Sequence, residues 1–295
     1  MKRPQHRLGL RAFAATAALG AAVLGCGSGT TAHRAADHLH ATDDGVLDVT
    51  ARDFGFVSEH ATVAAGSVPV AFTNEGHEPH QLQIGRLREP MTPEEFIALF
   101  EGEGDRASVD AVTWVGGVNV VEPGDTGSAT VDLAEGDYLM VCYVPDDSGT
   151  SHVMHGMVAA LHVGASATDA SAAAVADQVD PAETVVLRDF QIAVPQGFRG
   201  RGAVAFRNEG TDPHEVVFLR LDEGKTLADA AAYQADPTGD RPFDFAGGVA
   251  SVAPGTVAVA DLDLAPGDYL ATCFVPALDG TPHVDLGMLA TFTVT

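Results

Sequence analysis

The sequence predicts an all-β protein built from two tandem Greek-key β-sandwiches, each interrupted by one short helix. Short alternating segments, separated by Gly and Pro turns about every 8–12 residues, indicate the strands. About seven such strands per half are typical of a β-sandwich. The two halves form an internal repeat that shares three landmarks, Asn-Glu-Gly, Gly-Gly-Val and Gly-Asp-Tyr, beginning at Asn74, Gly116 and Gly136 and again at Asn208, Gly247 and Gly267.

The chain begins with a predicted lipoprotein signal peptide over residues 1–25. Basic residues precede an apolar, Ala-rich run at residues 13–24, which is shorter than the roughly 20 residues that a membrane-spanning helix needs. The run ends in Val-Leu-Gly-Cys26 and resembles a bacterial lipobox. That resemblance implies cleavage before Cys26, a lipid on its sulfur, and a membrane-anchored protein on the extracytoplasmic face. An ordinary signal peptide with an incidental cysteine is the alternative.

The remaining organisation follows from composition. Residues 26–45 are polar and aperiodic, which predicts a flexible tether. Residues 46–163 form the first expected domain and 184–295 the second, joined by an Ala/Ser/Asp-rich linker at residues 164–183. The chain carries 16 basic against 41 acidic residues, a formal net charge of −25. Because phosphates are bound by Lys and Arg, this balance argues against a nucleic-acid partner.

One helix is expected in each half. Thr92 can cap the first, Pro93 suits the first helical position, and Glu95 completes a capping box. Thr226 is the equivalent cap for a helix over residues 227–234 in the second half.

Each half also carries the same set of potential metal ligands in the same order. A histidine after the Asn-Glu-Gly segment is followed, about 60 residues later, by Cys, nine residues, His, three residues and Gly-Met. Apart from Cys26, each half has one cysteine, so no disulfide can form within a half. A bridge between the halves would need the two loops to face each other. Thiolate, imidazole and thioether together favour copper over a hard cation; the candidates are His80, Cys142, His152 and Met157, then His214, Cys273, His283 and Met288.

Taken singly, each of these residues has a structural explanation: a buried small hydrophobe, a core filler or a surface histidine. The other histidines, among them His77, His155 and His162, have no histidine at the equivalent position and are expected to be surface or supporting residues. The Gly-Gly-Val pairs fit either a close approach of backbone to a metal or a β-bulge.

The ordered pattern resembles the cupredoxin, or blue copper, family. The segment from Asn74 to His80 is similar to the first-ligand region of plastocyanin, and the Cys142–Met157 loop is similar to the type 1 copper loop of copper nitrite reductases. The resemblance implies one copper per half, held by the ligands named above with a weak axial methionine. It also implies one-electron transfer with unidentified redox partner proteins.

Two other functions stay open at this stage. A multicopper oxidase or nitrite reductase would need a further copper centre, which such enzymes connect through histidines beside the cysteine. Here Cys142 lies between Val141 and Tyr143, and Cys273 between Thr272 and Phe274, so an enzyme is not expected. A metal-free β-sandwich used for adhesion or scaffolding is the second alternative.

Overall fold

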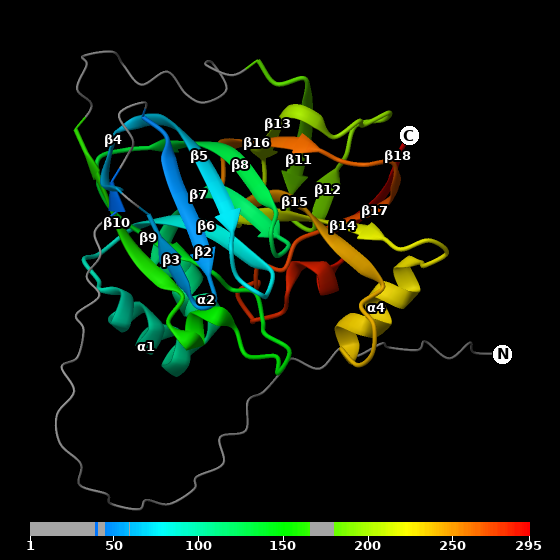
Figure 1. The fold of residues 1–295 in the computed structure, drawn as a ribbon, viewed down its shortest axis with the longest axis horizontal. Helices are drawn as coiled ribbons and strands as arrows, with labels where there is room; N and C mark the ends of the chain where they lie inside the picture. Colours follow the sequence, from blue (N-terminus) through cyan, green and yellow to red (C-terminus); the bar gives the residue numbers. More distant parts are fainter. Residues whose placement is uncertain (1–38, 41–44, 59, 166–179) are drawn as a thin grey trace, which may run out of the picture.

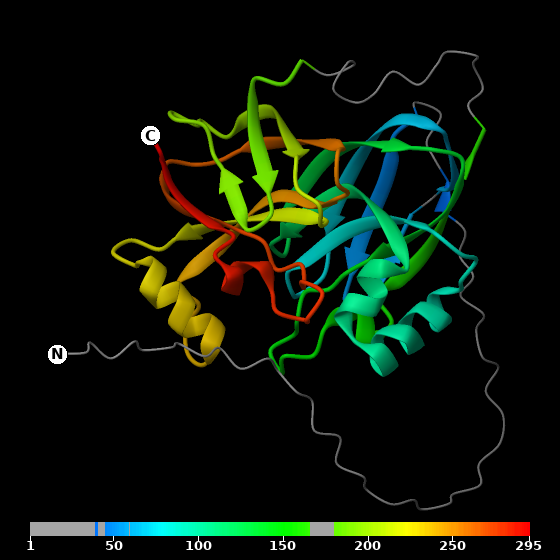
Figure 2. The ribbon, with the colours of Figure 1, turned by 180° about the vertical axis from the view of Figure 1, so that it is seen from behind.

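A computed structural model describes residues 39–40, 45–58, 60–165 and 180–295. Within these residues the protein consists of two β-sandwich halves lying side by side (Figure 1 and Figure 2). The all-β, two-sandwich prediction is confirmed. The strands of the first half are β1 (Leu39–His40), β2 (Leu47–Arg52), β3 (Gly55–Val57), β4 (His60–Ala64), β5 (Gly66–Asn74), β6 (His80–Leu87), β7 (Val112–Val121), β8 (Thr126–Leu133), β9 (Gly136–Val141) and β10 (Val158–Gly164).

The second half repeats this order, except that no strand among its described residues corresponds to β1 or β4. Its strands are β11 (Glu183–Arg188), β12 (Gln191–Ala193), β13 (Arg201–Asn208), β14 (His214–Leu221), β15 (Phe243–Val252), β16 (Val257–Asp263), β17 (Gly267–Thr272) and β18 (Leu289–Val294). In both halves the chain passes from one sheet to the other just before the strand that begins with the candidate ligand histidine, from β5 to β6 and from β13 to β14. That crossing places each histidine at the start of a new strand.

The two halves do not merely touch, because both of their sheets continue from one half into the other. One sheet has ten strands in the order β1-β4-β10-β9-β6-β7-β15-β14-β17-β18, and the other has eight in the order β12-β11-β13-β16-β8-β5-β2-β3. At the junctions β7 pairs antiparallel with β15, and β8 pairs antiparallel with β16. The halves therefore share backbone hydrogen bonds as well as side-chain contacts.

The register at these junctions relates the halves by an approximate two-fold axis. Val118 lies opposite Val249, and Ala129 lies opposite Ala260; in the sequence repeat these are equivalent residues. An antiparallel pair centred on a residue and its own equivalent is the signature of an isologous interface. The repeat is thus packed like a two-fold dimer within one chain.

Burial follows from this arrangement. In β5, Val68, Val70 and Phe72 point into the core while alternate residues are more accessible, as expected for a strand with one covered face. The first six residues of β6 and of β14 are all buried. Strands of this kind are covered on both faces: one by the sandwich core, the other at the junction between the halves.

The helices lie at one end of each half (Figure 1). Helix α1 (Pro93–Glu103) begins with the predicted capping box at Thr92, and helix α4 (Leu227–Ala235) begins at the predicted cap Thr226, which forms a capping box with Asp229. The first half carries in addition a six-residue helix α2 (Asp105–Asp110), entered through Gly104 at a positive φ of 82°. No helix among the described residues is both long and apolar enough to cross a membrane.

The proposed signal peptide, Cys26 and most of the tether and linker lie outside the described residues. The domain boundaries at residues 46–163 and 184–295 stay a prediction, and the shared sheets mean that they do not separate two independent bodies.

Candidate metal centres

The first centre lies where the start of β6 meets the loop between β9 and β10. His80 begins β6, Cys142 directly follows β9, and His152 begins a single 3₁₀ turn, η1 (His152–His155). The Sγ atom of Cys142 is 3.5 Å from Nδ1 of His152 and 4.0 Å from Nδ1 of His80. The two Nδ1 atoms are 3.0 Å apart. All three side chains are fully buried.

The second centre repeats this geometry. His214 begins β14, Cys273 follows β17, and His283 begins the turn η2 (His283–Leu286). Sγ of Cys273 is 3.6 Å from Nδ1 of His283, and the Nδ1 atoms of His214 and His283 are 3.1 Å apart. In each centre the three possible ligand atoms lie within 4.8 Å of one another.

These separations fit a bound metal ion. Ligands at metal distances of about 2.0–2.3 Å in a trigonal or tetrahedral site lie roughly 3.4–3.8 Å apart. The observed distances of 3.0–4.0 Å surround that range. The donor set of two imidazoles and one thiolate near a methionine suits copper. The structure therefore supports copper as the cofactor, with up to two ions per chain.

In each centre a carboxylate on the outer side determines which nitrogen of one histidine faces the ligand atoms. Nε2 of His152 is 2.8 Å from Glu78, and Nε2 of His214 is 3.1 Å from Asp189. A carboxylate accepts the Nε2 proton and leaves Nδ1 as a lone pair. At the other two histidines the carboxylate lies farther from Nε2, 3.5 Å between His80 and Asp53 and 3.9 Å between His283 and Asp212, and neither Nε2 atom has a hydrogen-bond partner among the described residues.

Two Nδ1 atoms and one sulfur therefore lie close together in a fully buried space. A cation bound among these donor atoms would take up their lone pairs. Burial, together with the neighbouring imidazole, lowers the pKa of His80 and of His283 to about 4. The imidazoles are therefore neutral at pH 7, the form that binds metals.

The cysteine thiols, unlike the neutral imidazoles, must lose a proton to bind a metal. Burial raises the pKa of Cys142 to about 12 and also raises the pKa of Cys273, so each is a thiol until a metal displaces the proton. One backbone N–H donates to each sulfur, from Gln81 at 3.4 Å and from Glu215 at 3.5 Å. Because these two residues follow the ligand histidines, the same strand start supplies a ligand and a hydrogen bond to the thiolate.

The Asn-Glu-Gly segment builds the floor beneath each histidine. Asn74 is buried, donates through Nδ2 to the carbonyls of Glu78 and Val121, and accepts from the N–H of Gly76. Asn208 makes the equivalent three hydrogen bonds. These bonds close the turn that delivers the histidine to the start of its strand.

Gly76 and Gly210 leave the space that the histidine and its carboxylate fill. A Cβ on Gly76 would lie 2.5 Å from Oδ1 of Asp53 and 2.6 Å from Nε2 of His80. On Gly210 it would lie 2.4 Å from Oδ1 of Asp189 and 2.6 Å from Nε2 of His214. Neither glycine has a positive φ, so the reason for glycine here is lack of space.

The Gly-Met end of each loop has a conformational cause. Gly156 and Gly287 end the 3₁₀ turns in the left-handed region, at φ of 94° and 99°, which favours glycine. The chain then reverses so that Met157 packs fully buried in the same core cluster as Cys142, and Met288 in the same cluster as Cys273. Their role as axial ligands stays a prediction.

Sequence reasoning missed the residues that cover the centres. Asp53 and Phe54 form the turn between β2 and β3, and their equivalents Asp189 and Phe190 form the turn between β11 and β12. Both phenylalanines have a positive φ of 62°. Phe54 stands edge-on to His152, with ring centroids 5.1 Å apart, and Phe190 to His283 at 5.2 Å. The repeated tripeptide Arg-Asp-Phe was the available signal.

Three of the other histidines contact carboxylates and not the ligand atoms. His77 is exposed and its Nδ1 is 2.6 Å from Asp53, so it supports the carboxylate beside His80. His155 and His162 likewise contact carboxylates away from the ligand atoms. Both described cysteines are free, so the bridge between the halves does not form.

The Gly-Gly-Val pairs allow neighbouring strands of the sheet to approach closely. A Cβ on Gly117 would lie 2.1 Å from the carbonyl oxygen of Leu82, and one on Gly248 would lie 1.9 Å from that of Val216. The ladders there shift register. Of the two explanations, the β-bulge holds and the approach to the metal does not.

No family model and no curated protein matches this chain. Solved structures do. A dithionite-reduced auracyanin from Roseiflexus castenholzii aligns with 42% of this chain and 98% of its own, at 19% identity and a TM-score of 0.29. A multicopper oxidase aligns over 88% and 94%, at 14% identity and 0.24. A copper-containing nitrite reductase from Thermus scotoductus aligns over 85% and 61%, at 11% identity and 0.23.

Because these TM-scores are low, the assignment of the fold and of the metal sites depends on the strand arrangement and the two ligand groups. The two-sandwich fold is similar to that of cupredoxins, and each half carries a His-Cys-His group suited to copper.

Proposed function

We propose that this protein is an exported, lipid-anchored electron carrier with one type 1 copper site in each domain. Bound copper would supply a one-electron couple between Cu(I) and Cu(II). The proposed ligands are those expected from the sequence: His80, Cys142, His152 and axial Met157, then His214, Cys273, His283 and axial Met288.

The observation that carries the proposal is the convergence of three fully buried donor atoms in each domain. Hydrogen bonds around each centre keep the donors in place: a carboxylate holds the outer nitrogen of one imidazole, and a backbone N–H donates to the sulfur. A rigid ligand set of this kind keeps its geometry in both oxidation states, which favours electron transfer over storage or delivery of copper.

Export and anchoring are supported by the sequence alone, through the apolar run at residues 13–24 and Cys26. Radiolabelled palmitate should enter the wild-type protein in a bacterial host that processes lipoproteins, and should not enter Cys26→Ser. Labelling of the serine variant would rule out lipidation at Cys26.

The alternative function, as a multicopper oxidase or nitrite reductase, would need copper beyond the two His-Cys-His groups. The copper content of the purified protein distinguishes an electron carrier from such an enzyme. The carrier reading predicts at most two coppers per chain, each reduced reversibly by one electron in a voltammetric titration. A third copper per chain would favour an enzyme, and bound copper that cannot be reduced would contradict electron transfer.

A further inference from the structure

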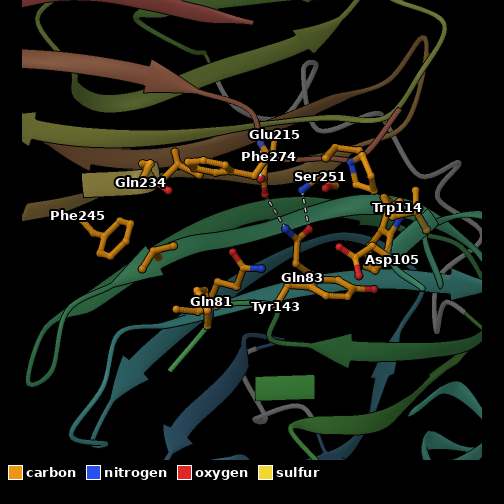
Figure 3. A pocket seen from close by; sticks show the side chains of 17 residues that line it. Gln81, Gln83, Asp105, Trp114, Tyr143, Glu215, Gln234, Phe245, Ser251 and Phe274 are labelled. Carbon is orange, nitrogen blue, oxygen red and sulfur yellow. Dashed lines mark hydrogen bonds between the residues drawn. The ribbon is translucent and has the colours of Figure 1, made fainter. Parts of the chain in front are cut away.

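A cavity of about 280 Å³ lies between the two halves, apart from the ligand atoms of both centres (Figure 3). Its floor is the middle of the ten-stranded sheet, where β6, β7, β15 and β14 meet. Residues 143–145 and 274–276, the equivalent segments that follow the two cysteines, line it as well. The cavity thus lies near the approximate two-fold axis and draws the same elements from each half.

The polarity of the cavity breaks this symmetry. Gln81 and Glu215 are equivalent residues, each directly after a ligand histidine, and both side chains line the cavity. One is a neutral amide and the other a carboxyl group. Asp105 contributes a second carboxyl group from helix α2. Burial raises the pKa of both carboxyl groups. A cation bound beside them would offset the cost of burying their charge, so the lining favours positive charge on its occupant.

Of the two acids, Glu215 gives the stronger indication of a cationic ligand. Its residue is only 5% exposed, and its carboxyl group accepts hydrogen bonds from Nε2 of Gln83 at 2.8 Å and the N–H of Phe274 at 3.1 Å. Both donors are neutral, and Glu215 takes part in none of the ion pairs found in the described parts of the chain. The nearby Arg106 is engaged with Asp110 and Asp212. Buried carboxylates normally have a cationic partner.

Aromatic side chains supply the rest of the lining. Trp114, Tyr143, Phe245 and Phe274 all face the cavity and are labelled around it in Figure 3. Faces of this kind attract organic cations. Trp114 is 2% exposed, and its Nε1 donor has no hydrogen-bond partner among the described residues. A buried indole N–H is normally satisfied by an acceptor.

We propose that this cavity binds a small organic ammonium ion that also carries an oxygen acceptor, with the cation toward Glu215 and the aromatic faces and the oxygen toward Nε1 of Trp114. The volume lies just below the usual range of about 300–1,000 Å³ for ligand pockets, which limits the ligand to a compact molecule. The proposal goes beyond the electron-carrier function and does not depend on bound copper.

Trp114 is the only tryptophan in the chain, so its fluorescence reports on the cavity directly. The test is a titration of the full, copper-free chain with choline, which has both a cation and a hydroxyl group, and with tetramethylammonium, which has the cation alone. Choline should change the emission of Trp114 saturably and bind more tightly than tetramethylammonium. Sodium chloride at equal ionic strength is the salt control. A flat choline titration of the folded protein through the millimolar range would overturn the proposal.

Variants assign the two contacts. Glu215→Gln should weaken choline binding at least about tenfold, because it removes the partner charge while keeping the shape and the hydrogen-bond acceptor. Glu101→Gln, on the exposed side of helix α1, is the matched control and should leave binding unchanged. Equal binding by Glu215→Gln and the wild-type protein would overturn the assignment of the charge.

A readout that needs no substitution guards against a Glu215→Gln protein that fails to fold. The indole N–H resonance of Trp114 in the wild-type protein should shift downfield with choline and move less with tetramethylammonium. An indole resonance that stays still while other residues respond would place the ligand elsewhere and refute the site.

Discussion

Gly76 offers the most direct test of how the first centre is built. Alanine at this position would bring a Cβ to 2.5 Å from Oδ1 of Asp53 and 2.6 Å from Nε2 of His80. Ordinary carbon contacts are about 3.5 Å, so the imidazole or the carboxylate must move by roughly 1 Å. Such a shift disturbs both the direction of Nδ1 and the hydrogen bond from the N–H of His77 to Asp53, which is 2.7 Å long.

The magnitude follows from two contributions. Overpacking a closed site costs about 1–3 kcal/mol of folding free energy. Disturbing a partner of a metal-binding histidine costs about 10–100-fold in metal affinity, or about 1.4–2.7 kcal/mol. We therefore expect Gly76→Ala to lower both the Tm of the copper-free protein and the affinity of the first centre.

The assay is a competition for Cu(I) against a coloured chelator, carried out in a Cys273→Ser background so that the first centre is the one measured. Gly55→Ala is the matched control: it lies in the same half, a Cβ there meets nothing within 4 Å, and its φ is not positive. Wild-type copper affinity in Gly76→Ala would refute the close fit of Gly76, His80 and Asp53.

Three further predictions test the surroundings of the centres. The pKa of His80 and of His283 is lowered to about 4, so between pH 6.5 and 4 the unfolded chain binds protons that the folded chain does not. The free energy of unfolding of the copper-free protein should therefore fall as the pH drops through this window, by up to about 3 kcal/mol per histidine. Urea denaturation at several pH values measures it, and a flat profile would contradict the burial argument. Asn208→Ala removes three hydrogen bonds of a buried turn and should cost about 2–4 kcal/mol in the same assay; a loss below 1 kcal/mol would show that the turn holds without them. Residues 46–165 expressed alone expose the edges of β7 and β8 and should form a two-fold dimer by analytical ultracentrifugation, whereas a stable monomer would contradict the importance of the shared sheets.

Much of the site could be predicted because its ligands lie in a repeated order. The Cys-x9-His-x3-Gly-Met loop is local, so its spacing alone brings Cys142 and His152 near each other, and the repeat around Cys273 gives the same answer twice. The fold class followed from strand alternation and turn spacing in the same way. The capping box at Thr92 was predictable because a cap is decided within one helical turn.

The features that were missed depend on contacts between distant segments. Asp53 reaches His80 across 27 positions of sequence, and its role follows from the positive φ of Phe54, which no pattern rule assigns to a phenylalanine. The pairing of Val118 with Val249 was missed because antiparallel edges carry no mark of their partner in the sequence. Helix α2 was missed because six residues are too few for a helical period to stand out.

The central claim is that each His-Cys-His group binds copper through its cysteine. Adding Cu(II) to the purified protein should produce an intense visible band from thiolate-to-copper charge transfer, saturating at two coppers per chain, with Cys142→Ser and Cys273→Ser each removing about half of it. Absence of the band at stoichiometric copper, in a protein shown to be folded, would contradict the claim and favour a metal-free scaffold.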